Sequence, residues 1–206
     1  MPYRVAAIVV LLVWISGAGD IAGQALSTER SRREALQRYR EGQSLLTAER
    51  WEKAVDAFRA AIRHEALFAD AHYGLGMAYM GLRRFTSAAQ AFEACIDAAR
   101  QLHRLRERDR VLERVSSSVN EPFVVPAHVL LALGSAHFRN GDRSRAEHYW
   151  TEAVEVNSSL GEAWNNLAAI YATGGRRRDA ERAVANAERA GFRVNPRLKE
   201  EITRIP

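Results

Sequence analysis

The chain has 206 residues, 47% of them apolar, and a formal net charge of +5, which suits a single domain of ordinary size. Lys53 and Lys199 are the only lysines, so nearly all the positive charge is arginine, and along residues 104–114 it is interleaved with acids as on a solvated helix. Because no aromatic-plus-basic platform accompanies this charge, the sequence argues against nucleic-acid binding. The single cysteine, Cys95, excludes an intrachain disulfide.

The first 25 residues have the pattern of a secretory signal peptide. A short basic start ending at Arg4 precedes the uncharged run Val5–Gly19, and Gly23 and Ala25 place small side chains where a signal peptidase inspects them. We therefore expect cleavage after Ala25 and an exported protein, periplasmic or secreted. The apolar run is short for a membrane span, which needs about 20 residues. The alternative is that residues 5–19 remain as an anchor, which is the only reason to expect contact with a membrane.

The rest of the chain repeats every 34 residues, in units 35–68, 69–102, 127–160 and 161–194. Position 8 of each unit is small: Gly42, Gly76, Gly134 and Ala168. Position 20 is always alanine: Ala54, Ala88, Ala146 and Ala180. Position 24 is larger: Phe58, Phe92, Trp150 and Val184. Small residues let two antiparallel helices approach closely, and the bulky residues are expected to fill the gap between neighbouring pairs.

In the last unit, Trp164, Leu167, Ala168 and Tyr171 are spaced three and four apart and share one helix face. This pattern resembles the tetratricopeptide repeat (TPR) family, whose signature is Trp-x2-Leu-Gly-x2-Tyr followed by Ala, Phe and Pro. Departures are Arg38 and His72 at position 4 of the first two units, and the absence of the final proline from all four. The resemblance implies an all-α fold, a TPR-type solenoid of helical hairpins wound as a right-handed superhelix.

Local signals place the helices of the first two units. Ser31 and Glu34 have the spacing of a capping box, which predicts a helix over 32–48, with a second helix from Trp51. Unit two is expected to turn at Gly81–Arg84 and to begin its second helix at Phe85. Trp51 and Phe85 hold the same position in their units, and we expect each to pack across the turn between its two helices.

Residues 103–126 interrupt the period. The second helix of unit two is predicted to run on through Leu112 and Val115 to a break at Ser116–Ser118. The segment 122–126, an apolar tripeptide between two prolines, is not expected to be helical. We interpret the insert as a surface insertion with a long helix. The alternative is that Phe123–Val125 folds back over the groove or docks a partner.

Units three and four are predicted to turn at residues 140–142 and 173–175, and the run Arg176–Arg178 to be solvated. Residues 195–206 restart a helix with Pro196 in its first turn. Its apolar face should cover the open end of the stack, as repeat arrays require. Cys95 occupies a position where the other units have alanine, which predicts a buried packing residue.

In the TPR family the first helices line a concave groove that holds a peptide or a partner helix. The resemblance places ten candidate residues there: Tyr39, Gln43, Tyr73, Met77, Met80, Leu131, Phe138, Arg139, Asn165 and Asn166. Methionine and tyrosine suit adaptable apolar contacts, although apolar stripes of this spacing are also typical of helix cores. The family's carboxylate clamp needs Lys and Asn where this chain has Tyr39 and Gln43, and its later Lys and Arg align with His128 and Ala132. The clamp is therefore absent, which argues against binding of cytosolic chaperone tails.

No enzyme motif is present: the histidines form no His-Glu-x-x-His pair, and there is no glycine-rich phosphate loop. The sequence therefore predicts a non-catalytic protein without cofactor or metal, an exported scaffold that binds a protein or peptide partner for assembly of an envelope complex. One alternative is a membrane-anchored TPR subunit of an export or cytochrome-assembly apparatus. A second is an enzyme whose site carries no recognisable motif.

Overall fold

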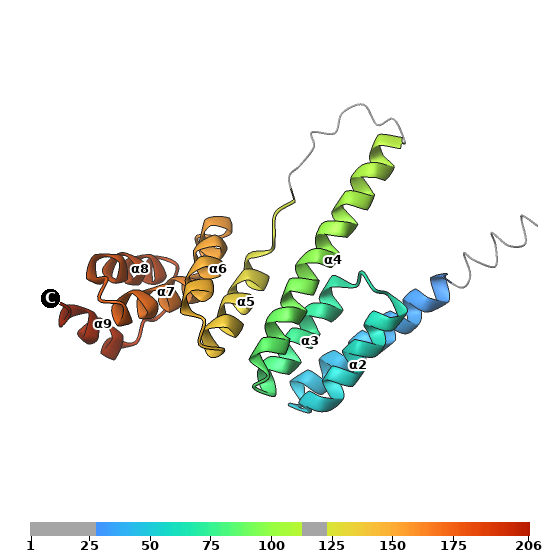
Figure 1. The fold of residues 1–206 in the computed structure, drawn as a ribbon, viewed down its shortest axis with the longest axis horizontal. Coiled ribbons are helices and arrows are strands. Elements are labelled where there is room, and N and C mark those ends of the chain that lie inside the picture. Colours follow the sequence, from blue (N-terminus) through green and yellow to red (C-terminus); the bar gives the residue numbers. More distant parts are fainter. Residues whose placement is uncertain (1–27, 113–122) are drawn as a thin grey trace, which may run out of the picture.

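The computed structural model describes residues 28–112 and 123–206, which form eight paired helices and a C-terminal helix (Figure 1). The first helix covers residues 28–47. The others are α2 Trp51–His64, α3 Ala69–Gly81, α4 Phe85–Leu112, α5 Ala127–Arg139, α6 Arg143–Val156, α7 Gly161–Thr173, α8 Arg177–Arg189 and α9 Pro196–Thr203. From α2 onward each helix packs on the next, including α4 on α5 across the insert. The predicted all-α array of hairpins is confirmed, while the predicted signal peptide lies outside the described residues.

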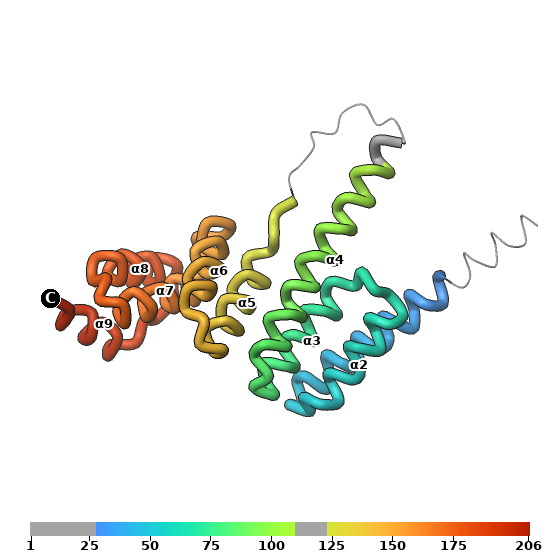
Figure 2. Tube along the Cα trace, viewed as in Figure 1, coloured from blue at the N-terminus to red at the C-terminus, as the bar shows by residue number. Residues whose placement is uncertain are grey.

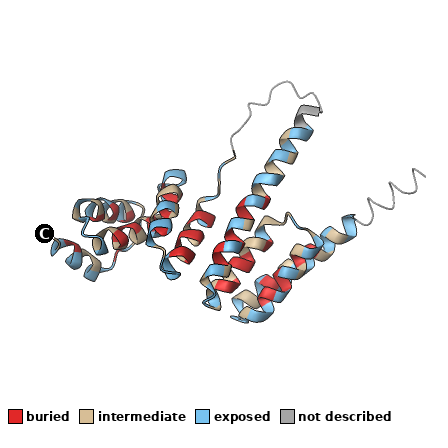
Figure 3. Ribbon diagram, viewed as in Figure 1, coloured by how far each residue is buried: buried red, intermediate tan, exposed pale blue. Residues whose placement is uncertain are grey.

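Two apolar cores run through the stack, and α5 belongs to both. Val129 and Leu133 pack with residues of α2, α3 and α4, whereas Leu130 packs with α6, α7 and α8. The buried side chains accordingly line the faces where helices meet, and the outer faces are exposed (Figure 3). The helices before and after the insert therefore form one continuous stack, although the sequence period is interrupted there.

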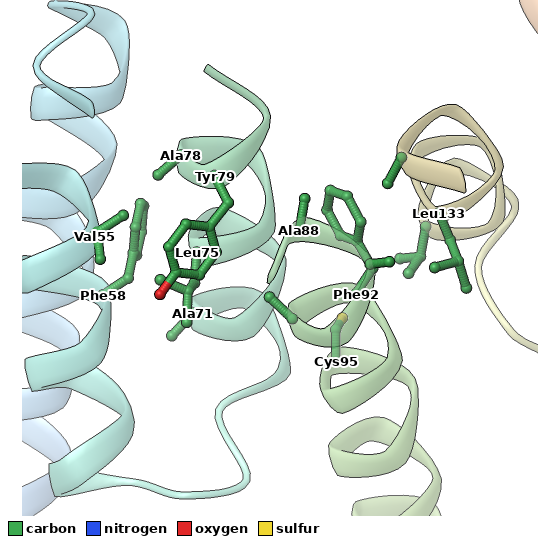
Figure 4. Packing of buried hydrophobic residues seen from close by; sticks show 14 of the residues in the cluster. Val55, Phe58, Ala71, Leu75, Ala78, Tyr79, Ala88, Phe92, Cys95 and Leu133 are labelled. Atoms are coloured by element: carbon green, nitrogen blue, oxygen red, sulfur yellow. The ribbon is translucent and has the colours of Figure 1, made fainter. Parts of the chain in front are cut away.

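Close approach of helices depends on glycine facing an aromatic ring. Phe92 is 0% exposed, and a methyl group on Gly76 would lie 2.4 Å from its Cε1 atom. Figure 4 shows this ring between α3 and α5. Phe58 lies between Gly42 of its own unit and Gly74 of the next, where added Cβ atoms would come within 2.7 and 2.5 Å of the ring. The prediction that position 24 fills the gap between pairs is confirmed.

The start of the first helix differs from the prediction. Residues 28–30 are already helical, so Ser31 lies inside the helix and cannot cap it. Its hydroxyl instead donates to the carbonyl oxygen of His64 over 2.7 Å. Glu34 accepts from Arg30 over 2.9 Å and lies 3.2 Å from Nδ1 of His64. The capping box is therefore wrong, and both residues link the first helix to the end of α2.

Trp51 and Phe85 contact the following repeat. A methyl group on Gly81, at the end of α3, would lie 2.4 Å from the Trp51 ring. The Arg139 guanidinium, at the end of α5, lies 5.3 Å from the Phe85 ring centroid. Both contacts join the start of a second helix to the end of the first helix of the next unit. The prediction that these rings pack across the turn within their own unit therefore differs from the structure.

At position 4 of unit two, histidine preserves a hydrogen bond that tryptophan makes in unit four. Trp164 Nε1 donates to the carbonyl oxygen of Ser158 over 3.0 Å. His72, which replaces tryptophan in unit two, places Nε2 3.0 Å from the carbonyl oxygen of Ala66. Each ring thus reaches the turn six residues earlier, so histidine can hold the inter-repeat turn as tryptophan does.

The predicted extension of α4 is confirmed as far as Leu112; Val115 and Ser116–Ser118 lie outside the described residues. In Figure 2 this helix projects beyond its neighbours. After the gap, Phe123 lies against α4, with its ring centroid 5.7 Å from both the His103 ring and the Arg100 guanidinium. Val125 shares a hollow with residues of α4 and α6, the second helices of their units. The segment therefore runs along the outer side of the stack and not over the groove.

The C-terminal helix α9 covers the last hairpin as predicted. Asn195 caps it by accepting from the Arg197 amide over 2.9 Å, and Ile202 is 2% exposed where α9 packs on α7 and α8. The arginine run at the start of α8 is exposed at Arg176 and Arg178, as predicted, and half-buried at Arg177. Two of these arginines also bond to neighbouring elements. Arg176 donates to Glu147 of α6 over 2.6 Å, and Arg177 donates to the carbonyl oxygen of Ile205 over 3.0 Å. These residues tie unit four to unit three and to the end of the chain.

Cys95 is a buried packing residue, as predicted, with 5% of its surface exposed. Burial raises the pKa of its thiol to about 11. Because the thiolate is the reactive form, this cysteine is inert at neutral pH in the folded protein.

Candidate functional site

Two adjoining hollows lie between α3, α5 and α7, the first helices of units two, three and four. We call this surface the groove. The hollow nearer the start of α5 has a volume of about 290 Å³ and is lined by Tyr73, Met77, Met80, His128, Leu131, Ala132, Ser135 and Glu162. The hollow nearer its end has a volume of about 320 Å³ and is lined by Met80, Phe85, Ser135, Phe138, Arg139, Trp150, Glu162, Asn166 and Ala169. Met80, Ser135 and Glu162 line both, so the hollows form one continuous surface.

Seven of the ten predicted residues line the groove: Tyr73, Met77, Met80, Leu131, Phe138, Arg139 and Asn166. The other three do not. Tyr39 and Gln43 belong to unit one, where the Tyr39 ring packs against Phe68 at 4.9 Å and its hydroxyl accepts from Gln43 Nε2 over 2.8 Å. Asn165, beside the lining residue Asn166, is half-buried.

Tyr73 and Phe138 differ in how far they belong to the core. The Tyr73 ring lies 5.5 Å from Phe92 and 5.1 Å from His128, and burial raises the pKa of its hydroxyl. Phe138 is 39% exposed and contacts Trp150 at 5.5 Å. Tyr73 thus lines the groove and also packs in the core, whereas Phe138 leaves a larger part of its surface exposed in the groove.

Two polar side chains of the groove are hydrogen-bonded within it. The Ser135 hydroxyl and the Trp150 indole both donate to the carbonyl oxygen of Leu131, over 2.9 and 3.1 Å. Arg139 lies over the Phe85 ring. Glu162 is exposed, and no hydrogen bond or ion pair to its carboxylate is found among residues 28–112 and 123–206.

Sequence reasoning placed Glu162 and Ser135 at positions 2 and 9, on the groove side of their units, but did not include them among the ten candidates. It also overlooked Phe85 and Trp150, because they come from second helices. Gly134 is the sequence feature that could have pointed to Trp150. A methyl group on Gly134 would lie 2.6 Å from the indole, so the ring packs directly against α5, and it also lines the groove.

The described parts of the chain contain no group of three or more His, Cys, Asp or Glu side chains placed to hold a metal ion. Within the same residues, no helix is both long and apolar enough to span a bilayer.

Comparison with known proteins agrees with this architecture. A tetratricopeptide repeat model matches residues 39–103 and 131–196. Photosystem I assembly protein Ycf3 of Rippkaea orientalis (strain PCC 8801 / RF-1) is 32% identical over 62 residues, which are 30% of this chain and 36% of that protein, so the chain matches only about a third of that relative.

Among solved structures, MamA superposes with a TM-score of 0.60 at 14% identity, covering 85% of this chain and 91% of MamA. YrrB, described as a TPR protein with an unusual peptide-binding site, superposes with a TM-score of 0.58 at 18% identity, covering 81% of this chain and 73% of YrrB. Identities this low concern the fold alone. With the repeat model matching more than half of the residues and four hairpins in one stack, the chain belongs to the tetratricopeptide repeat family.

Proposed function

We propose that this protein is an exported, non-catalytic scaffold that holds a peptide or partner segment in the groove. The TPR fold is a protein–protein interaction scaffold, and YrrB, which shares it, is described as having a peptide-binding site. The observation that carries the proposal is the exposed ring of Phe138 beside Met80, in a hollow of about 320 Å³. Rigid aromatic and flexible methionine side chains together suit an apolar anchor from a partner.

A non-catalytic role is supported by the chemistry of the groove. The Ser135 hydroxyl donates to a carbonyl oxygen instead of to a base, so it is not activated as a nucleophile. The lining offers a few polar groups in a largely apolar wall, which is typical of recognition surfaces.

Phe138→Asp should abolish the anchor while leaving the fold intact, because the side chain is exposed at the end of α5. Twelve-residue peptides would be selected on the full chain from a displayed random library, and their dissociation constants measured by fluorescence anisotropy. We expect the selected peptides to bind Phe138→Asp at least about tenfold more weakly, since an interface hot spot contributes about 2 kcal/mol or more.

The matched control is Val156→Asp, which places the same charge on a residue 41% exposed at the end of α6, outside the groove. It should bind like the wild type. Equal affinity of Phe138→Asp and wild type, with both folded by circular dichroism, would mean that the groove is not the binding surface.

Export is supported by the basic start, the run Val5–Gly19 and the small residues up to Ala25. An exported TPR scaffold fits assembly of an envelope complex. Expression with the native N-terminus, followed by intact-mass measurement and fractionation, should yield a soluble protein lacking residues 1–25. Full-length mass in the membrane fraction would instead favour the alternative, an anchored subunit of a membrane apparatus.

A further inference from the structure

Glu162 is placed where a groove occupant must cover it. It lies in the first turn of α7 and lines both hollows together with side chains of α3 and α5. Several other acids in the C-terminal half are paired, among them Glu147 with Arg176, Glu181 with Arg177, and Glu188 with Lys199. Glu162 differs from them because its carboxylate faces the groove without a cation.

The neighbours of this carboxylate are mostly apolar. Tyr73, Met77, Met80 and Leu131 share its hollow, and its charge contributes to the raised pKa of the Tyr73 hydroxyl on α3. An apolar segment seated in the groove would remove water from Glu162. Covering an uncompensated charge is unfavourable, so an occupant that brings no cation is disfavoured.

Within the described residues, no basic side chain of the groove forms an ion pair with this carboxylate. His128 shares its hollow but packs edge-on against the Tyr73 ring, with 5.1 Å between the ring centroids. Arg139 lines only the hollow at the end of α5, where it lies 5.3 Å from the Phe85 ring centroid. Glu162 and Arg139 are therefore not paired with each other, and the carboxylate lines both hollows. The chain as a whole is basic, at +5, so this acidic centre opposes the overall charge.

The two hollows also set the distance between the apolar contacts that a partner can make. Leu131 and Phe138, one in each hollow, are seven residues apart on α5, which is about 10 Å along the helix at 1.5 Å per residue. A partner with two apolar side chains at this distance can place one in each hollow. A residue between them then faces Glu162.

We infer that the groove selects a partner segment in which a lysine or arginine lies between two apolar side chains, with Glu162 as the counter-ion of that residue. The inference rests on the proposed function and adds the chemistry of the partner. Glu162 then determines specificity, while Phe138 and Leu131 supply apolar contact.

The test uses the same peptide library on the full chain, and then compares three variants. Peptides selected on the wild type should carry Lys or Arg between apolar residues. Their affinity should fall about tenfold on Glu162→Lys and less on Glu162→Gln, because the first adds repulsion and the second only removes attraction. A second selection on Glu162→Lys should enrich Asp or Glu at the central position. Glu155→Lys, the same charge change on an exposed residue of α6 outside the groove, should have no effect.

The results separate the two proposals. Peptides that depend on Phe138 but lack a basic residue, or basic peptides that bind Glu162→Lys unchanged, would overturn the role of Glu162 alone. Selected peptides that also ignore Phe138→Asp, or a library that yields no binder, would overturn the groove and the inference together.

Discussion

Gly76→Leu is expected to destabilise the repeat stack strongly. Even a single methyl group at Gly76 would lie 2.4 Å from Cε1 of Phe92, and that ring is 0% exposed, so it has nowhere to move. Overpacking a core by one or two carbons costs about 1–3 kcal/mol, and leucine adds four. We expect the melting temperature to fall by roughly 10 °C or more, measured by circular dichroism.

A double-mutant cycle gives this prediction a specific cause. Unit four has alanine and valine where unit two has Gly76 and Phe92, so Gly76→Ala with Phe92→Val recreates a pairing that the chain already contains. Each single change should destabilise, by about 1–3 kcal/mol for the alanine and about 2–4 kcal/mol for the valine. The free energy of unfolding lost in the double variant should be smaller than the sum of the two single losses by about 1 kcal/mol or more.

The control for the added methyl group is Gly174→Ala, whose nearest non-neighbouring atom would be the Ile170 carbonyl oxygen at 3.4 Å. Its stability should change by less than about 0.5 kcal/mol. Strict additivity in the Gly76–Phe92 cycle would show that the two residues do not share the contact described above.

Acidification below about pH 6.5 should destabilise the junction of units two and three through His137. This side chain is 5% exposed, stacks on Tyr149 at 5.4 Å, and has no hydrogen-bond partner at Nε2 within the described chain. Burial lowers its pKa in the folded state, with a further lowering by Arg145 that Asp142 and Glu93 oppose. The unfolded chain therefore binds the proton more readily, and stability present above pH 6.5 is lost as the pH falls below it.

His137→Leu should remove this dependence, because unit one has Leu45 at the same position. The measurement is the free energy of unfolding by urea for both proteins between pH 7.5 and 5. Carboxylates titrate in both, so the difference between the two curves isolates His137. The difference should shift in favour of the variant as the pH falls. A difference that stays constant would show that His137 is not held neutral by the fold.

The hairpins and their core could be predicted because helix packing requires a particular kind of residue at fixed positions of each unit. Gly76 and Gly134 have no room for a side chain opposite Phe92 and Trp150, so sequence spacing and packing carry the same information. The cap over the last hairpin was predictable for a similar reason. Leu198 and Ile202 are apolar and lie four residues apart on a short helix that is otherwise mostly charged, which indicates one buried face.

Helix ends and the exact lining of the groove were less predictable. Ser31 and Glu34 fit a capping motif, but such a motif works only in a first turn, and residues 28–30 extend the helix past it. Tyr39 holds a groove-side position, yet Phe68 lies against its ring and Gln43 occupies its hydroxyl. These outcomes depend on contacts between units, which spacing within one unit does not contain.

The direct stacking of α4 on α5 makes the covalent link between them dispensable for the interface. Arg139 over Phe85 and the hydrogen bond from Thr86 to Asn140 hold the two faces together from the end opposite the insert. A chain cut within residues 113–122 would keep that surface on both pieces. The protein therefore offers a natural division point, at which the two halves could be produced as separate polypeptides and reassembled by their own complementarity.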